Sequence, residues 1–172
     1  NNLDDSEEAM LNVTLEHGDI VDGLDILELG CGWGSLTCLM AKKFPTSKIT
    51  AVSNSNDQRI FIMSKCERLG LENVDVITAD MNDFNIDYQF DRVVSVEMFE
   101  HMRNYQELLN MVRFVYKNLK KGGKIITFHC CPINKGQEKE FEKLNGKIIK
   151  YIEFKNQDEP GYLHSTITDT FD

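Results

Sequence analysis

Apolar residues along the chain follow two alternating patterns. Short continuous runs that end in polar residues or glycines are typical of strands buried on both faces of a sheet. Longer segments with an apolar residue every three or four positions are typical of amphipathic helices. The runs predict strands over residues 25–29, 48–52, 74–78, 90–96 and 124–130. The periodic segments predict helices over residues 4–16, 35–44, 57–69 and 105–119.

Strands that alternate with helices predict βαβ units and a mostly parallel sheet. The tail differs, because a short helix over 137–144 precedes two strand-like segments, 147–154 and 162–170. The loop between them is rich in turn-forming residues, so we expect an antiparallel hairpin at the sheet edge. The fold class expected is α/β: a Rossmann-like, doubly wound, mostly parallel sheet of seven strands with this antiparallel C-terminal hairpin.

Composition restricts the partners and the setting. The 172 residues predict one domain, divided into an N-terminal helix (1–20), a core (21–131) and a C-terminal helix with hairpin (132–172). The net charge of −9 argues against a nucleic acid as the main partner. No apolar run approaches the length of a membrane span, so none is expected. The polar start and the odd number of cysteines, five, favour free thiols in the cytoplasm.

A glycine-rich loop, Gly30-Cys31-Gly32-Trp33-Gly34, follows the first predicted strand. Such a loop turns tightly and presents the N–H groups of a helix start to an anion. A dinucleotide site would have G-x-G-x-x-G and an acid after the second strand, and a P-loop would have G-K-[ST]. This chain has G-x-G-x-G instead. The alternative is a tight turn that binds nothing. Trp33 either lines a ligand pocket or packs on the sheet.

The loop belongs to a longer motif, residues 28–36, that resembles the first motif of class I S-adenosylmethionine-dependent methyltransferases. The residues of this motif resemble most the cyclopropane-fatty-acid-synthase-like branch, which includes the plant coclaurine N-methyltransferases. Residues 6–11, 48–55, 90–102 and 104–105 also resemble that branch, in the same order. The resemblance covers about residues 4–131 and identifies the chain as a member of this group.

The resemblance implies S-adenosyl-L-methionine as the cofactor, with S-adenosyl-L-homocysteine as its product. The loop glycines would contact the methionine part, and Glu28 would anchor the loop or bind the amino group. The alternative for Glu28 is a solvated acid at a strand end. The cofactor contacts expected are Glu28, Gly30, Cys31, Gly32, Gly34, Ser53, Asn54, Gln58, Ala79, Asp80, Met81 and Val96.

Two groups among these contacts carry a more specific role. Ser53 or Asn54, together with Gln58, would bind the ribose hydroxyls. Asp80 would accept a hydrogen bond from the adenine amine while Met81 packs on the ring. The alternatives are an exposed helix residue for Gln58, a loop acid for Asp80 and a core residue for Met81.

The candidate catalytic residues are Glu97, Glu100 and His101, within five positions after the fourth predicted strand. In a helical turn they would share a face, and the two carboxylates would raise each other's pKa. The resemblance assigns the chemistry to this stretch, so we expect Glu100 and His101 to form a base or orienting dyad. Glu97 would be a second carboxylate that faces a cation. The alternatives are a solvated charged turn, a capping or core histidine, and a metal site.

The residue at position 97 favours one class of acceptor. It is usually small in lipid-acting members of the branch and glutamate in the amine N-methyltransferases, which carry E-M-F-E-H as this chain does. We therefore expect N-methylation of a small amine by direct displacement, with no metal. The alternatives are a lipid, carbon or oxygen acceptor, and a truncated cofactor-binding domain without catalysis. We find no counterpart of the family's cover segment or substrate insertion, so we expect an open pocket.

Overall fold

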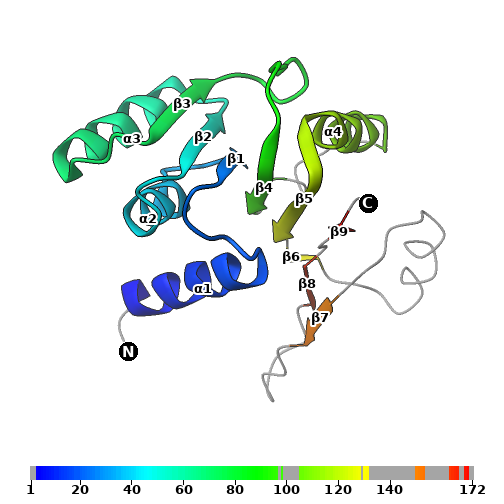
Figure 1. Cartoon of the computed structure of the whole chain (residues 1–172), viewed down its shortest axis with the longest axis horizontal. Coiled ribbons are helices and arrows are strands. Elements are labelled where there is room, and N and C mark those ends of the chain that lie inside the picture. The colour runs from blue at the N-terminus through cyan, green and yellow to red at the C-terminus, as the bar shows by residue number, and fades with distance from the viewer. Residues whose placement is uncertain are drawn as a thin grey trace.

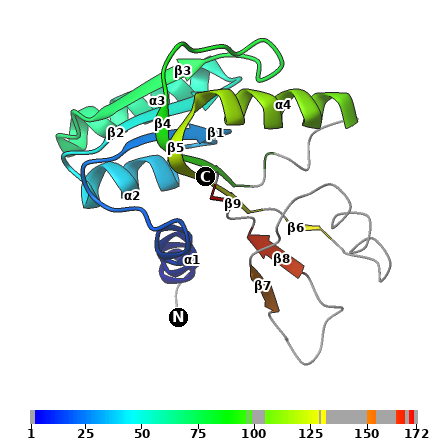
Figure 2. The ribbon, with the colours of Figure 1, turned by 45° about the vertical axis from the view of Figure 1, so that its right-hand side comes forward.

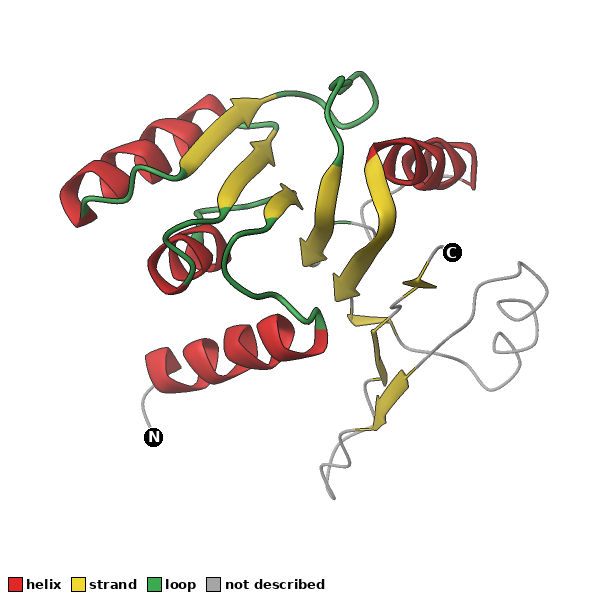
Figure 3. Ribbon diagram, in the orientation of Figure 1, coloured by secondary structure: helices red, strands yellow, loops and turns green. Residues whose placement is uncertain are grey.

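A computed structural model describes residues 3–96, 98, 105–128, 130–131, 150–153, 163–166 and 169–170 (Figures 1 and 3). Its helices are α1 (Leu3–His17), α2 (Ser35–Lys43), α3 (Asn56–Leu69) and α4 (Tyr105–Asn118). Its strands are β1 (Asp25–Leu29), β2 (Lys48–Ser53), β3 (Val74–Thr78), β4 (Phe90–Val96), β5 (Leu119–Phe128), β6 (Cys130–Cys131), β7 (Lys150–Glu153), β8 (Leu163–Thr166) and β9 (Asp169–Thr170). None of these helices is both long and apolar enough to cross a bilayer.

The main sheet has the strand order β3-β2-β1-β4-β5-β9. The first five strands are parallel, and β9 pairs antiparallel with β5 through Lys124 and Ile125. The chain order reverses between β1 and β4, which are neighbours with Leu29 opposite Ser95. In open α/β sheets a ligand binds outside the carboxyl ends of the strands at such a reversal. The topology therefore places a candidate site beyond Leu29 and Val96.

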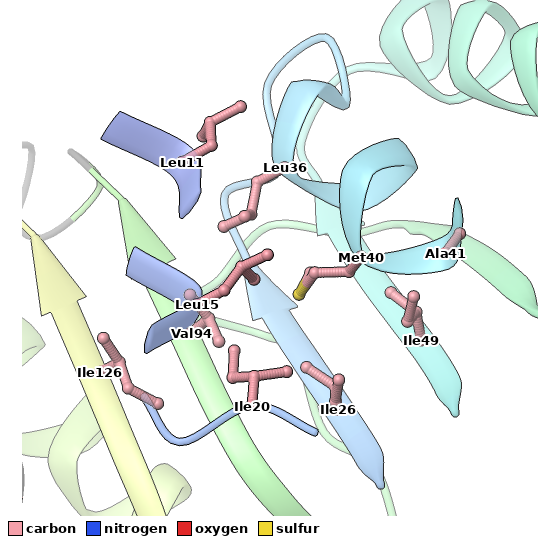
Figure 4. Close-up of a cluster of buried hydrophobic side chains, with 10 residues drawn as sticks. All are labelled: Leu11, Leu15, Ile20, Ile26, Leu36, Met40, Ala41, Ile49, Val94 and Ile126. Atoms are coloured by element: carbon pink, nitrogen blue, oxygen red, sulfur yellow. The ribbon is translucent and has the colours of Figure 1, made fainter. Parts of the chain in front are cut away.

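Helices cover both faces of this sheet. In Figure 2, α1 and α2 lie below the sheet and α4 lies above it. Figure 4 shows the cluster under α1 and α2, in which strand residues such as Val94 and Ile126 meet Leu15 and Met40. A second cluster, which includes Leu27 and the α4 residues Met111 and Val115, fills the opposite face. The apolar runs of the strands are thus explained by burial on both sides.

Local signals in the sequence set the ends of several elements. The Ser55 hydroxyl accepts a hydrogen bond from the Gln58 N–H at the start of α3, and Gly70 ends that helix with a φ of 66°. The Asn73 amide donates to carbonyls just beyond α2. Arg92 on β4 donates to the Gly18 carbonyl after α1 at 2.8 Å, which fixes that helix on the sheet.

The amino ends of the strands form the edge opposite to the candidate site. There the Lys120 ammonium lies 2.7 Å from Asp25 and 2.8 Å from Asp91. Burial raises the pKa of Asp91, but hydrogen bonds from Lys120 and from the Asp25 N–H outweigh it, so the pKa lies below its usual value. The three side chains join β1, β4 and β5 at one point.

Two expectations about the last strands need correction. The fifth strand begins at Leu119 rather than at residue 124, because Leu119 pairs with Phe90 before a register shift in the ladder. The two tail strands, β7 and β8, pair antiparallel, but in a separate three-stranded sheet with β6. The described main sheet therefore has six strands instead of seven. The sequence pattern predicts that the tail strands exist, but it does not specify which sheet they join.

Candidate functional site

The glycine loop joins β1 to α2 at the carboxyl edge of the sheet. The N–H groups of Gly30 and Cys31 both donate to the Val52 carbonyl, at 2.9 and 3.0 Å, and so fasten the loop to the end of β2. Gly30, Gly32 and Gly34 have φ values of 75°, 53° and 78°, a region that only glycine adopts without strain. The loop conformation therefore requires these three glycines.

The space around Gly32 differs from that around the other two glycines. A Cβ built on Gly32 would meet nothing within 4 Å, whereas one on Gly34 would lie 2.7 Å from Ile62. α2 begins directly afterwards, and its N-cap, Gly34, supplies no side-chain hydrogen bond. Helix N-termini attract anions because their first N–H groups have no partner within the helix. The open side of Gly32 and the start of α2 suit a carboxylate.

Glu28 lies beneath this loop, almost fully buried in β1. Its Oε2 accepts a hydrogen bond from the Thr37 hydroxyl in the first turn of α2 at 2.6 Å. Burial raises the pKa of Glu28 to about 7, and the bond from Thr37 opposes that shift only in part. Since the residue is only 4% exposed, the solvated-acid alternative is wrong for Glu28. The carboxyl ties β1 to α2 and so supports the loop.

Three buried thiols, one of them in the loop, belong to one core cluster. Cys31, Cys38 and Cys66 pack in one cluster, and all three are free. Burial, with the Glu28 charge adding to it, raises the pKa of Cys31 to about 12. A thiol with such a pKa is a poor nucleophile near neutral pH. Among the described residues, no group of three or more His, Cys, Asp or Glu side chains could hold a metal ion.

The end of β2 and the start of α3 bring two of the expected ribose contacts together. The Ser53 hydroxyl lies 2.5 Å from Oε1 of Gln58 and accepts a hydrogen bond from the Ser55 N–H at 3.1 Å. Asn54, which follows Ser53 in the sequence, is exposed. The Ser53–Gln58 contact shows that Gln58 is not simply an exposed helix residue. The arrangement places hydroxyl and amide groups beside the loop.

The segment after β3 lies next to this pair. The Ala79 N–H donates to the Ser53 carbonyl at 2.9 Å, which joins the ends of β2 and β3. Asp80 is exposed and accepts hydrogen bonds from the backbone and side chain of Asn82. Met81 is partly buried against the α4-side cluster. The structure thus brings the expected adenine contacts to the same edge as the ribose contacts.

The end of β4 completes the described part of the site. Val96 is partly buried and packs toward α1 and α2. The expected catalytic residues, Glu97, Glu100 and His101, lie outside the described residues. Met98 is described, and it packs so closely on Gly30 that a Cβ there would lie 2.9 Å from it.

Two contacts of the site were not predicted from the sequence. Thr37 has no motif of its own, and only its place one helical turn after the loop could have paired it with Glu28. Met98 lies within the E-M-F-E-H stretch, in which only the charged residues were predicted to have a role in the site. Both contacts depend on the sheet bringing distant segments together. Trp33 is 57% exposed and meets Phe61 edge to face at 5.3 Å, so it does not pack on the sheet.

Comparison with known proteins now decides the family. A family model described as mycolic acid cyclopropane synthetase matches residues 1–165. The chain belongs to this family. Because the match runs to residue 165, this cyclopropane synthetase resemblance extends beyond residue 131, the limit expected from the motifs. The chain has the S-adenosylmethionine-dependent methyltransferase fold, and its relatives use this cofactor.

Individual relatives in the cyclopropane synthetase family include both amine and lipid enzymes. The (S)-coclaurine N-methyltransferase of Thalictrum flavum subsp. glaucum is 40% identical over 129 residues, 75% of this chain and 35% of that protein. The cyclopropane-fatty-acyl-phospholipid synthase of Escherichia coli is 34% identical over 153 residues, 88% of this chain and 36% of that protein. The chain therefore spans about a third of the length of these relatives.

A solved structure supports the same assignment. Coclaurine N-methyltransferase bound to N-methylheliamine and S-adenosylhomocysteine superimposes with a TM-score of 0.72 at 37% identity. The match covers 76% of this chain and 38% of that one. The S-adenosylmethionine-dependent methyltransferase fold thus extends over most of this chain.

Proposed function

We propose that this chain is the cofactor-binding core of an S-adenosylmethionine-dependent N-methyltransferase that methylates a small amine. One observation carries the proposal: an open space at Gly32 beside the start of α2, at the switch point between β1 and β4. β4 continues in sequence into E-M-F-E-H. The similarity to coclaurine and pavine N-methyltransferases supports an amine acceptor.

The geometry supports a specific set of cofactor contacts. The methionine carboxylate would lie at the start of α2, over the open side of Gly32, with Glu28 anchoring the loop from below. Ser53, Asn54 and Gln58 would bind the ribose. The other contacts proposed are Gly30, Cys31, Gly34 and Val96 around the methionine part, and Ala79, Asp80 and Met81 around adenine.

The proposed reaction is a direct displacement. The nitrogen lone pair of the acceptor forms an N–C bond with the methyl group as the C–S bond breaks. The bonding electrons go to sulfur, which leaves as a neutral thioether, so the protein need not activate the leaving group. Its tasks are to orient the reactants and to remove the ammonium proton. Glu100 and His101 would take that proton, and Glu97 would hold the cationic acceptor.

Calorimetry and product assays test this function in sequence. We expect S-adenosylhomocysteine to bind and NAD not to bind. We expect methyl transfer to at least one secondary amine in a panel that includes tetrahydroisoquinolines. Glu100→Ala and His101→Ala should each lower kcat by about 10²-fold or more, because general acid–base catalysis contributes that much, while cofactor affinity is kept.

Glu67→Ala is the matched control, because Glu67 is an exposed glutamate on α3. It should leave kcat unchanged. If both dyad variants methylate as fast as the parent, the catalytic assignment is wrong. NAD binding in place of S-adenosylhomocysteine would overturn the methyltransferase assignment as a whole.

A lipid acceptor is the second candidate function. The fatty-acyl-phospholipid synthase match covers 88% of this chain, more than the 75% of the coclaurine enzyme. Unsaturated phospholipid vesicles in the same assay distinguish the two, since a cyclopropane product would favour the lipid. Cofactor binding without methylation of any amine or lipid would favour a non-catalytic cofactor-binding domain.

The remaining proposals concern the setting of the site. We propose that residues 1–172 form one methyltransferase domain that acts in the cytoplasm and does not bind nucleic acid. The net charge of −9 supports the last point, because it disfavours contact with phosphates. We propose that the main sheet has seven strands in the whole protein, while the antiparallel pair β7 and β8 belongs to the separate sheet with β6.

A further inference from the structure

The first and second glycines of the loop face different surroundings. A Cβ built on Gly30 would lie 2.9 Å from both Cβ and Cγ of Met98 and 3.2 Å from its Sδ. The same construction on Gly32 meets nothing within 4 Å. Gly32 thus leaves room for a ligand, whereas the space at Gly30 is taken by a side chain of the protein itself.

Met98 also contacts the wall of the site beyond the loop. It is partly buried and packs against the α4-side cluster, which includes Leu29 at the end of β1. Ala79 and Met81, the proposed adenine contacts, pack against the same cluster. A thioether side chain is flexible and polarizable, so it fits an irregular space of this kind. Met98 therefore joins the glycine loop to the apolar wall.

Chain connectivity extends the effect of this contact to its neighbours. Met98 stands one residue after Glu97 and two before Glu100. Consecutive Cα atoms are about 3.8 Å apart, so the Cα of Glu97 lies about that far from Met98 and that of Glu100 within about 7.6 Å. Holding Met98 against Gly30 thus limits how far the Cα atoms of Glu97 and Glu100 can lie from the loop.

We propose that Met98 is a positioning residue of the methyl transfer: its contact with Gly30 sets the distance from the cofactor loop to the acceptor-binding carboxylates. The inference rests on the proposed function. Displacement at carbon requires the nucleophile, methyl carbon and sulfur to align, and a misplacement of about 1 Å costs about 10²-fold in rate. Met98 itself need not touch the reacting atoms.

Kinetics of Met98→Ala and Met98→Leu test the proposal. We expect Met98→Ala to lower kcat by about ten- to a hundredfold, while the Kd for S-adenosylhomocysteine changes by less than about threefold. Met98→Leu keeps most of the volume and should restore kcat to within about threefold of the parent. Met63→Ala, on the exposed face of α3, is the matched control and should leave kcat unchanged.

A purely structural role for Met98 would give a different result. Met98→Ala would then lower the melting temperature and the active fraction, with kcat per folded molecule unchanged. That outcome overturns the proposal, as does a Met98→Ala enzyme with full kcat. Circular dichroism melts and active-site titration with S-adenosylhomocysteine distinguish these cases.

A binding cycle tests the contact independently of catalysis. Gly30→Ala should weaken S-adenosylhomocysteine binding at least about tenfold in the parent, because the added methyl meets Met98. In a Met98→Gly background the same change should cost several-fold less, since the three nearest atoms are gone. If the effects of Gly30→Ala and Met98→Gly on the binding free energy are additive, the two residues are not coupled and the proposal is wrong. If no acceptor is methylated, the proposed function fails, while this cycle still reports on Met98.

Discussion

At the scale of single residues, the buried carboxyl of Glu28 makes the stability of the protein depend on pH. Its pKa is raised to about 7 from a usual value of 4.5, chiefly by burial. Between those two values the folded protein keeps the proton and the unfolded chain loses it. Stability therefore falls as the pH rises from about 4.5 to 7, because the folded state binds more protons there.

Glu28→Gln should remove this dependence. Glutamine keeps an acceptor for the Thr37 hydroxyl without a buried charge, so the free energy of unfolding at pH 8 should rise by about 2–3 kcal/mol. Urea denaturation at pH 5 and pH 8 measures the change, with Glu67→Gln as an exposed control. If the free energy of unfolding of Glu28→Gln changes between pH 5 and pH 8 as much as that of the parent, Glu28 is not the source of the pH dependence.

The same Glu28→Gln variant decides between two roles of Glu28 that the sequence left open. If the carboxyl only anchors the loop, the variant should bind S-adenosylhomocysteine within about threefold of the parent, since the Thr37 bond persists. If it binds the amino group of the cofactor, affinity should fall at least about tenfold, because a charge-assisted hydrogen bond is lost. The bond to Thr37 favours the first result.

At the scale of elements, the strands of the core were predictable and their later partners were not. Apolar runs predicted β1, β3 and β4 with the bounds that the structure has. The pattern is clearest in β1, where four of the five residues are buried. The start of β5 was missed, since the pairing of Leu119 with Phe90 depends on a register shift. Likewise, the motif predicted the loop glycines, but Thr37 and Met98 are brought to them only by tertiary packing.

Asn73 gives a prediction at this scale. Its Nδ2 donates to the carbonyls of Phe44 and Ser47, each at 3.0 Å, and so connects the end of α2 to the start of β3. Asn73→Ala should lower the free energy of unfolding by about 1–3 kcal/mol, because partly buried carbonyl acceptors lose their hydrogen-bond partner. Chemical denaturation checks it, and Asn85→Ala, at an exposed loop position, should change stability by less than about 0.5 kcal/mol.

The Asn73 change should not reach the cofactor site. Asn73 precedes β3, at the amino edge of the sheet, whereas the proposed ribose and adenine contacts follow β2 and β3 at the other edge. Binding of S-adenosylhomocysteine to the folded Asn73→Ala protein should therefore equal that of the parent. If the fully folded variant binds S-adenosylhomocysteine more weakly than the parent, the amino and carboxyl ends of the strands are coupled through α2.

At the scale of the whole molecule, the carboxyl ends of the strands carry the proposed binding site, whereas contacts at their amino ends stabilise the fold. The carboxyl edge carries the glycine loop with its open space, and the buried carboxyl of Glu28 there is costly to the fold. The amino edge carries the pairing of Lys120 with Asp25 and Asp91, which joins three strands far from the site. This separation is expected of α/β folds, in which binding groups follow the strands and the opposite edge supports them.

Lys120→Met tests this division, because methionine keeps the apolar stem but not the charge. Lys120 is about a third exposed, so the loss should be only about 1–2 kcal/mol at pH 7, with Lys121→Met as the exposed control. The Asp91 pKa lies below 3.8, so this contribution is present above about pH 4 and disappears as the pH falls through the pKa of the folded state. The parent and Lys120→Met should therefore differ in stability at pH 7, and this difference should shrink as the pH falls below about 4. Both should bind S-adenosylhomocysteine equally at pH 7. A difference in stability that persists at low pH would show that lost packing, rather than lost charge, destabilises the variant.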